Sequence, residues 1–139
     1  MKQLFLFPLL CFVQQILAQG SVTVHVKPVQ DAKGEISVAL YRKPSDFPHP
    51  VRVYVAQTPK AVKGTNIIRF TNLPAGNYAA AAYHDENGNK KLDKNIFGAP
   101  TEPYGFSNDA RRLMSAPSFD EARFEIRNNE ESEIHIQIK

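Results

Sequence analysis

The stretch "SVTVHVKPV", residues 21–29, determines the fold class because valine occupies every second position from 22 to 26. Threonine, histidine and lysine fill the positions between and after these valines. Side chains of an extended strand point alternately to its two faces, so the pattern places the valines in a core and the polar residues in solvent. The expected core residues are Val22, Val24 and Val26.

The same alternation recurs along the chain in short stretches separated by turn residues. These stretches are "EISVALYRK" (35–43), "VRVYVAQ" (51–57), "NIIRFTNL" (66–73), "ARFEIRN" (122–128) and "EIHIQIK" (133–139). One more stretch, "NYAAAAYHD" (77–85), is apolar on both faces, as expected for a central strand. About seven short strands without sustained helical periodicity predict an all-β fold, a single antiparallel β-sandwich.

The longest segment without alternation runs from residue 85 to residue 118. Loops of this length in compact domains are usually either functional or disordered, and the aromatic and apolar residues of this one predict a long ordered loop. At its end, "SFDEA" (118–122) predicts a single helical turn with Ser118 as its N-cap.

The N-terminal stretch "MKQLFLFPLLCFVQQILAQG" has one positive charge, then an apolar run, then small residues, which is the layout of a secretory signal peptide. We therefore expect residues 1–18 to be a signal peptide and residues 19–139 to form the sandwich domain in the periplasm or outside the cell. The only cysteine is Cys11, so the domain has no disulfide. A lipidated cysteine usually follows a small residue, but Leu10 precedes Cys11, so we expect no lipid anchor.

The charge is nearly balanced, with 17 Lys and Arg against 14 Asp and Glu. No basic run alternates with aromatic residues, which argues against nucleic-acid binding. No segment after the leader is long and apolar enough to span a membrane. We expect a monomer with an unidentified protein or carbohydrate partner in the cell envelope.

The stretch "HDENGNKKLD" (84–93) carries oxygen-bearing side chains at alternate positions. With Asp85 as position 1 of an EF-hand-type loop, Asn87, Asn89, Lys91 and Asp93 occupy positions 3, 5, 7 and 9, which supply ligands to calcium in such loops. Position 7 acts through its backbone carbonyl. The pattern therefore predicts a Ca²⁺ site.

The match to an EF-hand loop is partial. The glycine, Gly88, stands at position 4 and not at position 6, and Ile96 replaces the glutamate of position 12. A further carboxylate would have to complete the site, and Glu102 is the nearest one downstream. The alternative is a plain surface turn, because Asn, Asp and Gly are also the residues that turns favour.

The stretch "GAPTEPYGFSN" (98–108) offers Tyr104, Phe106 and Asn108 as contacts for a sugar or peptide, with ordinary loop packing as the alternative. The leading hypothesis is a non-enzymatic binding or accessory module whose loop is organised by calcium. Two other functions are kept open: a small hydrolase that uses carboxylates of the same loop, and a structural subunit that pairs through the sheet edge at residues 133–139. The four histidines have no zinc-like spacing, and the two in strands, His25 and His135, are expected to be exposed on polar faces.

Residues 73–112 resemble the signature of a bacterial exported family, domain of unknown function 2141. The motifs that carry the resemblance are "HDENGNKKLD", "GAPTEPYGFSN" and the later "PSFDEARFEI" (117–126). This resemblance implies export and no known activity. The "LPAGNY" turn (73–78) and its strand are also similar to transthyretin-like and Cna B-type sandwiches, some of which carry calcium loops after that strand; this implies calcium by analogy only.

Overall fold

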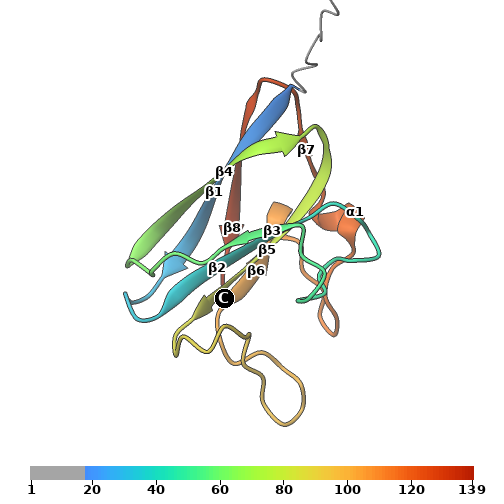
Figure 1. The fold of residues 1–139 in the computed structure, drawn as a ribbon. Coiled ribbons are helices and arrows are strands. Elements are labelled where there is room, and N and C mark those ends of the chain that lie inside the picture. Colours follow the sequence, from blue (N-terminus) through green and yellow to red (C-terminus); the bar gives the residue numbers. More distant parts are fainter. Residues whose placement is uncertain (1–17) are drawn as a thin grey trace, which may run out of the picture.

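The computed structural model describes residues 18–139 and shows two sheets packed face to face (Figure 1). The expected signal peptide, including Cys11, lies outside the described residues except for Ala18. The strands are β1 (Gln19–Val29), β2 (Glu35–Tyr41), β3 (Val55–Gln57), β4 (Gly64–Pro74), β5 (Gly76–Asp85), β6 (Tyr104–Phe106), β7 (Phe124–Ile126) and β8 (Glu131–Gln137). Two single turns of helix, η1 (Ser107–Asp109) and α1 (Phe119–Ala122), precede β7. The expectation of an all-β sandwich is confirmed.

The smaller sheet has the order β4-β1-β8. β1 and β4 are antiparallel, whereas β1 and β8 run parallel, with His25 opposite His135. This parallel pair departs from the expected antiparallel sandwich. β8 is an edge strand of this sheet, as residues 133–139 were expected to be.

The larger sheet has the order β3-β2-β5-β6, and β7 pairs with the first residues of β5. β5 is therefore central, as its apolar residues on both faces predict. It pairs with β2 on one side, from Asp85 to Ala79, and with β6 and β7 on the other. Because β5 ends at Asp85, the segment that follows begins at the end of a central strand.

The core between the sheets consists of the residues that alternation predicts to point inward. Val22, Val24 and Val26 of β1 are completely buried, and Ile36, Val38 and Leu40 of β2 face them. Ile136 of β8 is also completely buried. A second cluster, around Tyr41, Phe106 and Phe119, fills the space under η1 and α1.

The predicted strand at residues 51–57 is wrong over its first half. Turns continue as far as Arg52, whose N–H donates to the His49 carbonyl, and pairing with β2 starts only at Tyr54. Val51 is consequently 82% exposed. Prolines at 48 and 50 favour these turns because proline has no N–H to give to a sheet.

The predicted loop of residues 85–118 contains β6 and η1, so the irregular part of it is shorter than expected. The predicted cap is confirmed: the Ser118 hydroxyl accepts from the Glu121 N–H, and the Glu121 carboxylate accepts from the Ser118 N–H at 2.6 Å. In residues 18–139 the structure has no helix with the length and apolar character needed to cross a membrane.

Candidate functional site

The segment between β5 and β6, residues 86–103, projects from one end of the sandwich and is drawn in yellow to gold in Figure 1. We call residues 85–103 the acidic loop. Its two ends are held together, because the His84 N–H donates to the Pro103 carbonyl at 2.9 Å. The predicted calcium ligands all lie in this loop.

Two buried carboxylates organise the acidic loop. Asp85 is completely buried, and its two oxygens accept the backbone N–H groups of Asn89 at 3.1 Å and Lys90 at 2.7 Å. Glu102 is 7% exposed and accepts the N–H groups of Glu86 and Asp93, both at 3.0 Å. Glu102 therefore reaches the loop, as the completion of the predicted site requires.

A third carboxylate, Asp93, gathers the two asparagines. Its Oδ2 lies 2.6 Å from Asn87 Nδ2, and its Oδ1 lies 2.7 Å from Asn89 Nδ2. The asparagine oxygens accept backbone N–H groups two residues ahead, from Asn89 and from Lys91. Five of the predicted ligand side chains thus share one hydrogen-bond network. Lys91 enters it through its N–H.

Lys90 occupies position 6 of this loop with a φ of 64°. An EF-hand loop has glycine at position 6 to make a sharp turn. A lysine in the left-handed region is uncommon, yet the backbone makes that turn here. The misplaced glycine in the sequence therefore does not prevent the loop from following this course.

Three carboxylates of the acidic loop, Asp85, Asp93 and Glu102, have no cationic side chain as a partner in the described part of the chain. Within residues 18–139, no Lys, Arg or His nitrogen lies within 4.0 Å of a carboxylate oxygen of Asp85, Asp93 or Glu102. Lys90 Nζ pairs instead with Glu35 at 3.3 Å. The pKa of the Tyr83 phenol is raised, mainly by burial. A hydrogen bond with Ser37 lowers this pKa, and the negative charges of Asp85 and Glu102 raise it.

The three carboxylates do not meet in one tight cluster. In the part of the chain that the structure describes, a single group of three His, Asp or Glu side chains has its ligand atoms all within 4.8 Å of one another, and it consists of His25, Glu133 and His135 on the other sheet. Sequence reasoning treated both histidines as exposed residues with no zinc-like spacing. Only the parallel pairing of β1 with β8 brings them together, and no local pattern signals that pairing.

A family model described as "Uncharacterized protein conserved in bacteria (DUF2141)" matches residues 24–135 of this chain. The chain belongs to the DUF2141 family. The match covers the whole acidic loop. It also covers β1 except for its first residues and β8 except for its last residues. No curated protein and no solved structure matches this DUF2141 chain.

The three residues of this DUF2141 chain that were expected to contact a partner lie in three different environments. Phe106 is 8% exposed and packs edge-on against Phe47, so it contributes to the core and not to a recognition surface. Tyr104 is half-buried beneath the Arg111 guanidinium, 5.1 Å from the ring centroid. The Asn108 side chain donates to the Arg123 carbonyl at 2.8 Å. Phe106 and Tyr104 thus show the loop packing that was the alternative, Asn108 is exposed and hydrogen-bonded, and partner contact by these residues stays a prediction.

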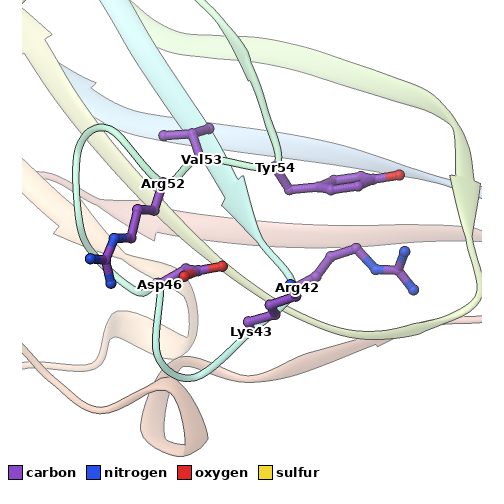
Figure 2. A pocket seen from close by; sticks show the side chains of 6 residues that line it. All are labelled: Arg42, Lys43, Asp46, Arg52, Val53 and Tyr54. Atoms are coloured by element: carbon purple, nitrogen blue, oxygen red, sulfur yellow. The ribbon is translucent and has the colours of Figure 1, made fainter.

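An open pocket of about 530 Å³ lies at the segment that connects β2 to β3. It is lined by Arg42, Lys43, Asp46, Arg52, Val53 and Tyr54 (Figure 2). Figure 2 shows the Arg42 and Tyr54 side chains extending in the same direction, and the Arg42 guanidinium lies 5.2 Å from the Tyr54 ring centroid. Three cationic residues and one carboxylate line this pocket, and the Arg42 guanidinium lies over the Tyr54 and Tyr78 rings. The pocket was not expected from the sequence.

Proposed function

We propose that this DUF2141 chain is an exported, non-enzymatic binding or accessory module whose acidic loop is held in shape by a calcium ion. Export is supported by the signal-peptide pattern of the first 18 residues. The observation that carries the calcium proposal is the buried charge of the loop. Asp85 and Glu102 are buried carboxylates without a cationic partner in the described chain, and buried charges in proteins are paired or coordinate metals.

The donor chemistry fits calcium, which prefers carboxylate, amide and carbonyl oxygens. Asp85, Asn87, Asn89, Asp93 and Glu102 supply such side-chain oxygens, and Lys91 supplies a backbone carbonyl. Half a turn of an asparagine amide exchanges its nitrogen for its oxygen. The groups that now donate to Asp93 would then present oxygens beside it, which is the arrangement that a cation requires.

The ordered loop would hold a small apolar surface away from the sandwich. Ile96 and Phe97 are 93% and 87% exposed, and the turn that carries them is closed by the side chain of Asn95, which accepts the N–H groups of Phe97 and Ala99. Exposed apolar residues on a rigid turn suit contact with a protein or carbohydrate of the cell envelope. In this proposal the calcium ion fixes the loop, and the loop contacts the partner.

The test is the thermal unfolding midpoint of the purified protein in calcium and in chelator. Calcium at a hundred times its Kd should stabilise the fold by about 2.7 kcal/mol, which raises the midpoint of a domain of this size by about 8–15 °C. Asp93→Asn keeps a hydrogen-bond acceptor but removes one charge, so it should lose most of the calcium-dependent shift.

The matched control is Asp120→Asn, because Asp120 is an exposed carboxylate on α1, away from the acidic loop. It should show the full shift. The proposal is wrong if millimolar calcium leaves the midpoint of the unmodified protein unchanged, or if Asp93→Asn responds to calcium as the control does.

A further inference from the structure

The outer face of the three-stranded sheet carries two histidines and a glutamate side by side. His25 of β1 is opposite His135 of β8, and Glu133 is opposite Thr23 one step along the same face. The two imidazole rings are stacked, with their centroids 4.6 Å apart and their planes at 23°. These three side chains are called the His-Glu-His cluster below.

The ligand atoms of the His-Glu-His cluster converge on one oxygen. Glu133 Oε1 lies 2.6 Å from His25 Nε2 and 3.9 Å from His135 Nε2. His25 Nε2 is nevertheless a buried atom with no hydrogen bond in the part of the chain that the structure describes. Because the distance from His25 Nε2 to Glu133 Oε1 is short, it is the angle at which the oxygen approaches the nitrogen that does not allow a hydrogen bond. A shared proton along the N–H axis therefore does not explain why this carboxylate approaches the ring.

The neighbouring acidic residue is already occupied. Glu131, on the same face of β8, accepts a hydrogen bond from the Thr23 hydroxyl at 3.0 Å and pairs with Arg69 at 3.4 Å. It does not join the cluster. The His-Glu-His cluster therefore offers three ligands, and its side facing the solvent is open, because the side chains of Glu133 and His135 are 61% and 53% exposed.

We propose that His25, Glu133 and His135 bind a divalent transition-metal ion of the zinc or copper class. Two imidazoles and one carboxylate are a common donor set for such ions, and calcium does not prefer imidazole. Three protein ligands leave at least one coordination position for water or another small ligand. The site is independent of the calcium proposal, since the cluster and the acidic loop share no residue.

The experiment is a calorimetric titration of metal-free, untagged protein with zinc, in calcium-containing buffer. One ion should bind per chain. Loss of a second-shell partner typically weakens metal binding by about 10–100-fold, so loss of the direct ligand in His135→Ala should weaken it at least as much. His49→Ala is the matched control because His49 is exposed in a turn and is not part of the cluster, so this variant should bind zinc as the unmodified protein does. Binding should also weaken at acidic pH, because an imidazole must be unprotonated to bind a metal.

A second readout separates ligation from a loss of fold. With copper as the probe, the electron paramagnetic resonance spectrum should show coupling to two imidazole nitrogens, and to one in His135→Ala. The metal-free thermal midpoint of His135→Ala should match that of the unmodified protein, since this side chain is half exposed. Absence of saturable micromolar binding would overturn the proposal. So would zinc binding that survives in His135→Ala or that is lost in Asp93→Asn.

Discussion

Ser107 shows how one hydroxyl holds three elements together. The side chain is completely buried at the start of η1. It accepts the Ala80 N–H of β5 at 2.9 Å and donates to the Ala122 carbonyl at the end of α1. Backbone groups therefore engage this hydroxyl both as a donor and as an acceptor, so its role is structural.

Ser107→Ala should destabilise the fold by about 1–3 kcal/mol, the usual cost of leaving a buried polar group without its partner. The free energy of unfolding from urea titration measures the effect. Ser45→Ala is the control, because Ser45 is exposed and its substitution should change stability by less than about 0.5 kcal/mol. Equal stabilities of the two variants would show that water replaces the hydroxyl.

At the scale of elements, β6 connects the two sheets. It pairs with β5, and the N–H of its first residue, Tyr104, donates to the Lys139 carbonyl just after β8. A Cβ built on Gly105 would lie 2.2 Å from the Gln137 carbonyl oxygen and 2.9 Å from Ile136 Cγ2. Glycine is required here by the close approach of the two strands.

Gly105→Ala should therefore force β6 away from β8 and destabilise the fold by about 1–3 kcal/mol, as overpacking does elsewhere. The downstream end of the acidic loop should loosen with it, since β6 begins two residues after Glu102. Hydrogen exchange of the Tyr104 and Lys139 amides measures the local effect. Unchanged exchange at these two amides would contradict the strand contact described above.

The outer edge of β8 bears on the alternative function of strand pairing with another protein, because its C-terminal end is already occupied. At Gln137 the N–H donates to Asp109 Oδ1 at 2.9 Å, and the carbonyl accepts from the Arg111 guanidinium at 3.3 Å. These two side chains occupy the backbone groups that an added strand would need. The prediction that β8 is an edge strand is confirmed, whereas its blocked end could not be inferred from the sequence.

Alternation predicts individual strands well and their pairing poorly. The inward residues of β1 and β2 follow from period two alone, because burial of one strand face is a local property. Val51 alternates equally well but is exposed, since it finds no partner strand. His25 and His135 meet only because the first and last strands are neighbours. The calcium pattern was visible because all its residues except Glu102 lie within one short stretch.

At the scale of the whole molecule, β8 completes the core. Ile136 and Ile138 are buried against residues of both sheets. β8 is one of the two strands that pair with β1, the other being β4. The chain contains a single cysteine, so no internal disulfide compensates for weak packing. Stability therefore depends on β8 and on Ile138 directly after it.

Removal of residues 131–139 should leave a chain without a cooperative thermal transition, because β1 would lose a partner and the core would lose both isoleucines. Near-ultraviolet circular dichroism and the unfolding curve measure this. Ile138→Val is the milder comparison, which should keep a cooperative transition with a loss of about 0.5–1.5 kcal/mol. A cooperative transition in the truncated chain would show that the remaining strands suffice.

The neighbouring position of β1 and β8 also dictates when the domain can fold. The ribosome releases β1 before β8, so the small sheet cannot close until β8 has also been released. Until residue 137 has emerged, the nascent polypeptide lacks the strand that seals its interior. It therefore cannot bury its core completely before that strand is available.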